Sequence, residues 1–161
     1  SAIPTGGIAP RYAAEVLALT KAASVASDLH AGLVIGSDTM VVVDGRAMGK
    51  PRDRAHAASM LDGLFGRWHE VISGLALIDV TSDRRLVLSD TTRVRIDRPK
   101  AERLAAYLDA GDWRGKAGGY NLAELVGDWQ FEIDGDPTTV IGLPMQRLGD
   151  ALARLRAKSG H

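Results

Sequence analysis

Residues 33–51, LVIGSDTMVVVDGRAMGKP, decide the fold class. Leu33 to Val43 is rich in β-branched residues, Asp44-Gly45 is typical of a tight hairpin turn, and Arg46 to Gly49 can return as a second strand. The stretch therefore predicts a β-hairpin that ends at Lys50-Pro51.

Helix and strand patterns alternate around that hairpin. Apolar residues at helical spacing, bounded by Pro, Asp or Gly, predict helices over about 10–28, 53–66 and 99–111 and from Pro144 onward. A glycine-rich loop follows the third helix, over 111–119. Strand patterns cover 71–80 and 86–96, joined by a turn at Ser82-Asp83, and the short segments 131–133 and 139–141. Hairpins interleaved with helices predict one α/β or α+β domain over 1–161, with a mixed twisted sheet and helices packed around it.

Composition narrows the function classes. A chain of 161 residues with 45% hydrophobic residues suits one globular core. Twenty basic and twenty acidic residues balance, so no overall charge attracts a nucleic acid polymer or an anionic membrane. The absence of cysteine removes disulfides, thiolate metal sites and a cysteine nucleophile. The sequence offers no apolar run near the roughly 20 residues of a membrane span and no secretory signal pattern, so we expect a cytoplasmic protein.

Asp38 is the first candidate for chemistry, because strand interiors seldom contain Asp. The alternative is an outward-facing carboxylate on a half-exposed strand. A two-residue hairpin loop would place Thr39 opposite Lys50, and a three-residue loop would place Asp38 diagonal to Lys50. Either register predicts a carboxylate, a hydroxyl and a lysine within a few ångströms of each other.

Several cations stand where they could converge on a phosphate ligand. Lys21 follows Leu17 by one helical turn and could lean over the next strand, although a lysine covering its own helix is the alternative. The segment 111–117 fails the P-loop pattern, and His69 is more typical of a structural hydrogen bond than of a base. The cations that stand beside Gly, Pro or helix ends are Lys21, Lys50, Arg52, Arg114 and Lys116.

Several blocks of the chain, in the family's order, resemble the Maf family of nucleotide pyrophosphatases. The resemblance covers nearly all of the sequence, and ordered blocks together are more specific than any one of them. The blocks are Lys21-Ala22, Val34 to Thr39, Asp44-Gly45, Met48 to Pro51, Met60-Leu61, Gly66 to Val71, Lys116 to Tyr120, Gly135-Asp136 and Val140 to Pro144.

The resemblance implies an enzyme that hydrolyses a nucleoside triphosphate such as dTTP or UTP, or a modified nucleotide, between its α and β phosphates. Mg²⁺ or Mn²⁺ would be the cofactor. Asp38 would take the catalytic position, with Thr39 near the substrate and Lys21 and Lys50 on the phosphates. Two neighbouring lysines would make the carboxylate a poor proton acceptor, so metal ligation or water positioning by Asp38 is favoured over a general-base role. Lys116 would be a further substrate-binding cation.

Two departures from the family pattern affect these expectations. The resemblance implies a strand and a Ser-x-Ser-Pro-Arg-Arg loop before residue 1, so we expect either a longer natural protein or a chain that is nearly inactive and self-associates through an open edge of the 33–43 strand. Many relatives carry a base-contacting glutamine where this chain has Ala123. We expect the base pocket to include Tyr120 to Glu124, with Asn121 as a polar contact. Glu124 would be the acceptor for a base N–H, unless it is only a solvated surface residue.

Other functions stay open on the sequence alone. A Maf-like protein that binds nucleotides without catalysis is the principal alternative, and a hydrolase of the same broad fold acting on purine triphosphates is a third. We also expect a homodimer.

Overall fold

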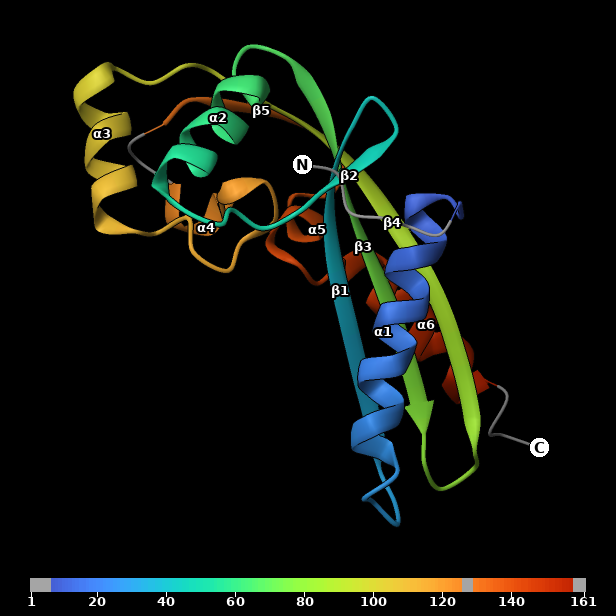
Figure 1. The fold of residues 1–161 in the computed structure, drawn as a ribbon. Helices are drawn as coiled ribbons and strands as arrows, with labels where there is room; N and C mark the ends of the chain where they lie inside the picture. The colour runs from blue at the N-terminus through green and yellow to red at the C-terminus, as the bar shows by residue number, and fades with distance from the viewer. Residues whose placement is uncertain (1–6, 126–128, 158–161) are drawn as a thin grey trace.

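A computed structural model describes residues 7–125 and 129–157 (Figure 1). A short 3₁₀ helix, η1 (Ala117–Gly119), lies among the longer elements. In chain order these are α1 (Pro10–Ala26), β1 (Leu33–Val43), β2 (Arg46–Met48), α2 (Arg54–Leu64), β3 (Trp68–Asp79), β4 (Arg84–Ile96), α3 (Ala101–Ala110), α4 (Leu122–Leu125), β5 (Phe131–Asp134), α5 (Pro137–Ile141) and α6 (Met145–Ala157).

The strands form one five-stranded sheet in the order β2-β1-β3-β4-β5. Both predicted hairpins are confirmed, since β1 pairs with β2 and β3 pairs with β4. Helices around a sheet confirm the α/β class, but the sheet is antiparallel rather than mixed. In the described part of the chain all four strand pairs are antiparallel, and parallel pairing is limited to one isolated bridge between Phe65 and Ile96. The turns that join β1 to β2 and β3 to β4 are too short for the crossover that a parallel neighbour needs, so these two pairs must be antiparallel.

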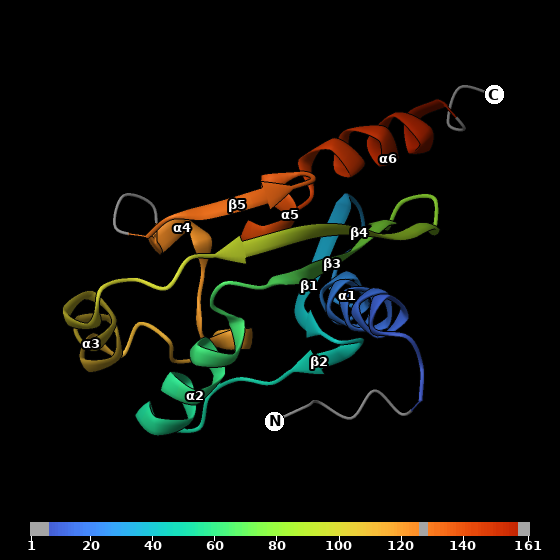
Figure 2. The ribbon, with the colours of Figure 1, turned by 90° about the horizontal axis from the view of Figure 1, so that it is seen from above.

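The helices cover the sheet unevenly. Figure 2 shows α1 on one face of β1 and β3, with α5 and α6 on the opposite side. Helices α2, α3 and α4 gather at one end of the sheet, where the largest buried cluster lies (Figure 1). That cluster contains Leu61, Leu64, Val71, Val94, Ile96, Tyr107, Trp113, Tyr120 and Trp129.

The packing of α1 on the sheet is unusually close. Its inward face carries alanines, and two glycines lie beneath it: a Cβ at Gly36 would collide with the carbonyl oxygen of Ala18, and a Cβ at Gly74 with that of Ala14. Gly74 is also the β3 partner of Asp38 in the ladder. The helix therefore passes directly over the strand segment that carries the candidate carboxylate.

One predicted strand is wrong. Residues 139–141 belong to the helix α5, not to a strand. Asp136 caps this helix by accepting a hydrogen bond from the Thr138 backbone N–H at 2.9 Å, Pro137 occupies its first turn, and Gly142 ends it with a φ of 119°. These end signals outweigh the β-branched composition of the segment. The helix α4 was not predicted.

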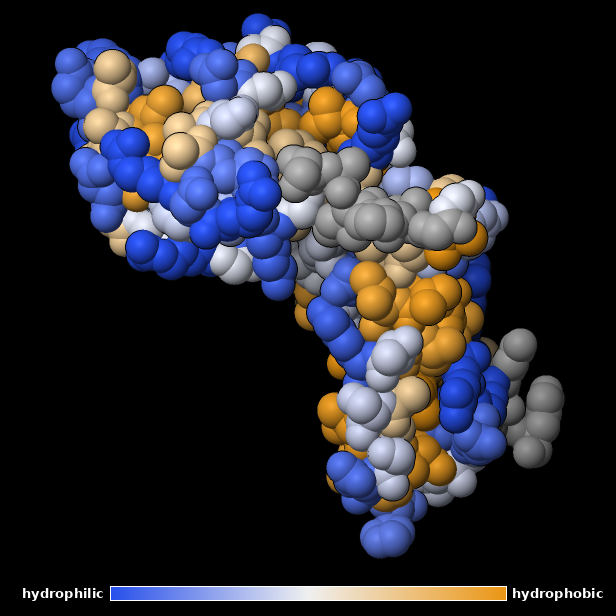
Figure 3. All heavy atoms as spheres, viewed as in Figure 1, coloured by the Kyte–Doolittle hydropathy of each residue, from blue (hydrophilic) through white to orange (hydrophobic). Residues whose placement is uncertain are grey.

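Part of β1 has an open edge. Because β2 pairs only with Val41 to Val43, the earlier residues of β1 pair with β3 alone among the described residues. Leu33 and Ile35 are 45% and 42% exposed there. Apolar side chains also gather on the outer surface of α1 (Figure 3), where Tyr12, Val16 and Leu17 are exposed. Within the described ranges, no helix combines the length and hydrophobicity that crossing a membrane requires. Homodimerisation stays a prediction.

Candidate active site

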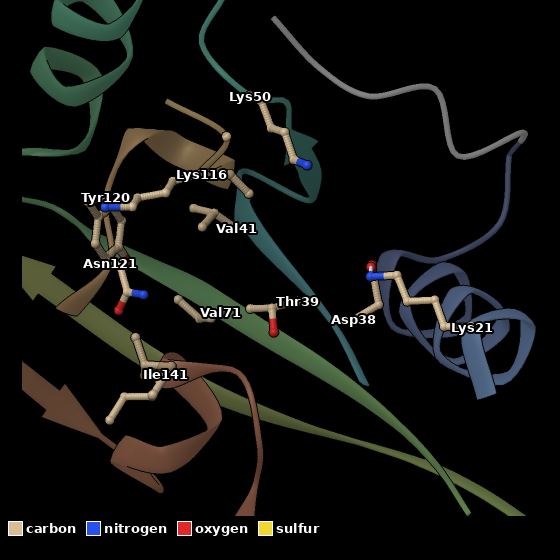
Figure 4. A pocket seen from close by; sticks show the side chains of 13 residues that line it. Lys21, Asp38, Thr39, Val41, Lys50, Val71, Lys116, Tyr120, Asn121 and Ile141 are labelled. Atoms are coloured by element: carbon tan, nitrogen blue, oxygen red, sulfur yellow. Dashed lines mark hydrogen bonds and ion pairs between the residues drawn. The ribbon is translucent and has the colours of Figure 1, made fainter. Parts of the chain in front are cut away.

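A cavity of about 250 Å³ opens beside β1 at Asp38 to Val41, where the pairing with β2 begins (Figure 4). Seven of the eight site residues predicted from the sequence line it. They come from α1, β1, the segment after β2, and the loop that contains η1. They are Lys21, Asp38, Thr39, Lys50, Lys116, Tyr120 and Asn121.

Asp38 and Lys21 form an ion pair, with Lys21 Nζ 2.5 Å from Asp38 Oδ1. The side chain of Asp38 is 17% exposed and that of Lys21 is 59% exposed. The predicted reach of Lys21 over the strand is thus confirmed. Its cause is the close contact of α1 with Gly36 and Gly74, which lie under the adjacent turns of the helix.

Lys50 enters the cavity by a different route from the one predicted. The hairpin has the two-residue loop, with Val43 opposite Arg46, but pairing stops at Met48. The Gly49 carbonyl instead accepts a hydrogen bond from the Gly118 backbone N–H at 3.2 Å, which draws the chain toward η1. The ladder therefore does not place Lys50 opposite Thr39. Among the described residues Asp38 pairs with Lys21, and Lys50 lies on the other side of the opening (Figure 4).

Thr39 belongs to a buried polar row that sequence reasoning missed. Its Oγ1 lies 2.7 Å from Ser73 Oγ, and Ser73 donates to the Thr139 carbonyl oxygen at 2.7 Å. Thr139 donates in turn to Asp90 at 2.5 Å, and Arg147 also contacts Asp90. Ser73 and Thr139 are fully buried. This row ties α5, which supplies Val140 and Ile141 to the cavity wall, to the strand that carries Asp38.

The far end of the cavity is built by the segment around η1. The Tyr107 hydroxyl donates to the Gly119 carbonyl at 2.6 Å, and the Tyr120 hydroxyl lies 2.7 Å from His69 Nε2. Burial lowers the pKa of His69 to about 4, so the imidazole is neutral at physiological pH. Burial also raises the pKa of Tyr120 above its ordinary value. His69 is thus a structural hydrogen-bonding residue, as expected.

Comparison with known proteins identifies the family. Residues 3–155 match the family model described as Maf-like protein. The chain belongs to the Maf family. It is 41% identical over 151 residues to a protein of Pelotomaculum thermopropionicum named dTTP/UTP pyrophosphatase, covering 94% of this chain and 79% of the relative.

Two further relatives carry the same name. A protein of Ruminiclostridium cellulolyticum is 38% identical over 149 residues, covering 92% of this chain and 77% of the relative. One of Desulforamulus reducens is 41% identical over 138 residues, covering 86% and 72%.

Glu124 is the one predicted site residue of this Maf-family chain that does not line the cavity. Its carboxylate forms an ion pair with the Lys116 ammonium instead. Glu124 lies on α4, whose first turn directs it toward Lys116 rather than into the opening. The role predicted for Glu124, as acceptor for a base N–H, therefore has no geometric support here.

The donor set of this Maf-family site limits how a divalent cation could be held. Within 7–125 and 129–157, no group of three or more His, Asp or Glu side chains converges. Asp38 is the carboxylate in the cavity, and its Oδ1 faces Lys21. Mg²⁺ keeps several waters and is commonly held by one or two carboxylates together with substrate phosphates. Asp38 fits such a substrate-borne cation.

Proposed function

We propose that this Maf-family chain is a nucleoside triphosphate pyrophosphatase that hydrolyses dTTP and UTP to the monophosphate and pyrophosphate. The names of its relatives at about 40% identity support this substrate class. The observation that carries the proposal is the polarity of the cavity. Asp38 and Lys21 lie at one end with Lys50 across the opening from them, and Tyr120 and Ile141 lie at the other end beside Lys116 and Asn121 (Figure 4). A triphosphate fits the first end and a base the second.

The two lysines and Thr39 have different roles in the proposed reaction. Water adds across the α–β phosphoanhydride bond, which breaks and releases pyrophosphate with additional negative charge on its leaving oxygen. Lys50 and Lys21 stabilise this charge because both ammonium groups border the same opening. Thr39 contacts the substrate from the strand between them, and its hydroxyl is oriented by Ser73.

Asp38 orients the attacking water or a cation bound by the substrate. One carboxylate oxygen faces Lys21, which leaves the second oxygen for that contact. Mg²⁺ or Mn²⁺, when bound with the triphosphate, would neutralise phosphate charge and polarise the reacting phosphoryl group. Asp38 is the residue that would hold it.

The test is pyrophosphate release from a panel of eight ribo- and deoxynucleoside triphosphates, each with Mg²⁺, with Mn²⁺ and with a chelator. We expect release from dTTP and UTP above all others, and Asp38→Asn should lower turnover at least about 100-fold because it removes charge at the reacting centre. Asp44→Asn is the matched control, since Asp44 pairs with Arg67 in the hairpin turn outside the cavity. Parental turnover by a folded Asp38→Asn variant would contradict the assignment. Nucleotide binding without any release would favour the alternative, a binding protein without catalysis.

A further inference from the structure

We propose that Asn121 selects the base: its side-chain amide N–H donates a hydrogen bond to a ring carbonyl of uracil or thymine. This inference rests on the proposed function and names the group that gives it its specificity. Asn121 lines the apolar end of the cavity, next to Tyr120, and is half-buried. Figure 4 shows its amide nitrogen directed toward the middle of the opening.

The orientation of the Asn121 amide is fixed by the backbone. Its Oδ1 accepts a hydrogen bond from the Ala123 backbone N–H at 3.0 Å, at the start of the short helix α4. Only the oxygen of a carboxamide can accept, so the amide cannot flip without losing this bond. The nitrogen, which donates two hydrogens, is thereby the atom left for a ligand.

Neighbouring polar groups reinforce this donor character. The Lys116 ammonium also lines the cavity and is a donor only, and its ion pair with Glu124 holds it beside η1. The Tyr120 hydroxyl lies 2.7 Å from Nε2 of His69, a residue that does not line the cavity. The apolar side chain of Ile141 also lies at this end (Figure 4). A base bound here meets hydrogen-bond donors on apolar walls.

This pattern matches pyrimidines that carry two carbonyls. Uracil and thymine present oxygen acceptors at positions 2 and 4, whereas cytosine has an amino donor at position 4. If the Asn121 N–H faced the amino group of cytosine, both donors would lack a hydrogen-bond acceptor. In a partly desolvated site, two unpaired donors cost considerable binding free energy.

The decisive variant is Asn121→Asp. The carboxylate keeps an acceptor for the Ala123 N–H, so the start of α4 is preserved, but an acceptor replaces the donor in the cavity. We expect the ratio of kcat/KM for UTP to that for CTP to fall at least about tenfold, with the CTP value itself rising. Gln130→Glu is the matched control, because it makes the same amide-to-acid change at an exposed residue that does not line the cavity.

A second variant separates the hydrogen bond from the added charge. Asn121→Ser keeps a side-chain oxygen that can cap α4 but is too short to bring a donor to the base. It should lower kcat/KM for UTP and dTTP without raising that for CTP. Thermal unfolding of each variant establishes that it is folded.

Binding measurements keep this inference separate from the proposed function. The α,β-imido analogues of dUTP and dCTP, which resist cleavage, are titrated calorimetrically into the parent chain and each variant. A parent chain that releases no pyrophosphate refutes the proposed function, yet a dUTP-over-dCTP binding preference that Asn121→Asp reverses still supports the role of Asn121. If folded Asn121→Asp keeps the parental preference for the dUTP analogue, the role of Asn121 is refuted. It is also refuted if Lys116→Met loses this preference while Asn121→Asp keeps it.

Discussion

The buried imidazole of His69 makes the stability of the protein depend on pH in a calculable way. His69 is 3% exposed, and burial lowers its pKa from 6.5 to about 4. In the unfolded chain the ring binds a proton near pH 6.5, whereas in the folded protein it does so only near pH 4. Between these values the unfolded state holds more protons, so the free energy of unfolding falls as the pH falls. The stabilisation is fully present above pH 6.5 and is lost as the pH drops through 4.

The magnitude follows from the size of the pKa shift. At about 1.4 kcal/mol per pKa unit, lowering the pKa from 6.5 to about 4 corresponds to roughly 3 kcal/mol over the whole window. Roughly 2 kcal/mol of this should be lost between pH 7 and pH 4.5. For a domain whose total stability is about 5–15 kcal/mol, such a loss is readily measured.

The perturbation that isolates this effect is His69→Gln. The Arg67 carbonyl can only accept, so His69 Nδ1 carries the hydrogen and Nε2 accepts from the Tyr120 hydroxyl. A glutamine can accept that bond through its side-chain oxygen but does not titrate. We expect urea denaturation to show that the free energy of unfolding of His69→Gln falls between pH 7 and pH 4.5 by roughly 2 kcal/mol less than that of the parent.

The control is His30→Gln, because His30 is exposed in the folded protein as it is in the unfolded chain. Its unfolding free energy should follow the parental pH dependence. Equal losses in the parent and in His69→Gln would refute the reasoning, because the acid sensitivity would then come from other groups.

Three shorter predictions concern the site and its support. Gly74→Ala places a Cβ against the Ala14 carbonyl, so it should destabilise the protein by about 1–3 kcal/mol and lower turnover by moving α1 and Lys21. Gly63→Ala is the control, because its Cβ meets open space and should change neither quantity. Urea denaturation measures the stability of both variants, and pyrophosphate release measures their turnover. Lys50→Ala should lower kcat, because its ammonium is proposed to contact charge that grows on the leaving group, and a change in KM alone would make it only a binding residue. Glu124→Ala should alter the ranking of nucleotides more than the rate with the best one, because it frees Lys116 from its ion pair at the proposed base site; an unchanged ranking would show that Glu124 takes no part in base recognition.

Local signals allowed much of the fold to be predicted. The Asp44-Gly45 turn was predictable because Asp and Gly tolerate the left-handed backbone that such a turn needs. In the structure both residues adopt it, with φ of 50° and 75°. The helix α5 was missed because Val140 and Ile141 favour a strand by composition, although Asp136, Pro137 and Gly142 carry the end signals of a helix. In so short a segment the capping residues decide.

The candidate site was predictable in its residues but only partly in its geometry. Lys21 and Asp38 are 17 residues apart, and their contact depends on how closely α1 packs on the sheet. In the sequence, only Gly36 and Gly74 indicate this close packing. The role of Ser73 in the polar row could not be predicted from the sequence. A serine in an apolar strand indicates such a role only when Thr39 and Thr139 are known to face it. Lys116 and Glu124 meet through a turn between η1 and α4 that has no periodic pattern.

These differences follow from how the two ends of the cavity are built. The charged end stands on β1 and α1, whose spacing is fixed by backbone contact at Gly36 and Gly74, so a substitution there disturbs the sheet itself. The opposite end stands on a short segment held in place by two side-chain hydrogen bonds, one donated by Tyr107 to the Gly119 carbonyl and one accepted by His69 from the Tyr120 hydroxyl. A change at Asn121 or Lys116 leaves those bonds and the sheet intact. We therefore expect base preference to change by single substitutions while the residues proposed for phosphate chemistry stay in position, and the variants of Asn121 test this separation directly.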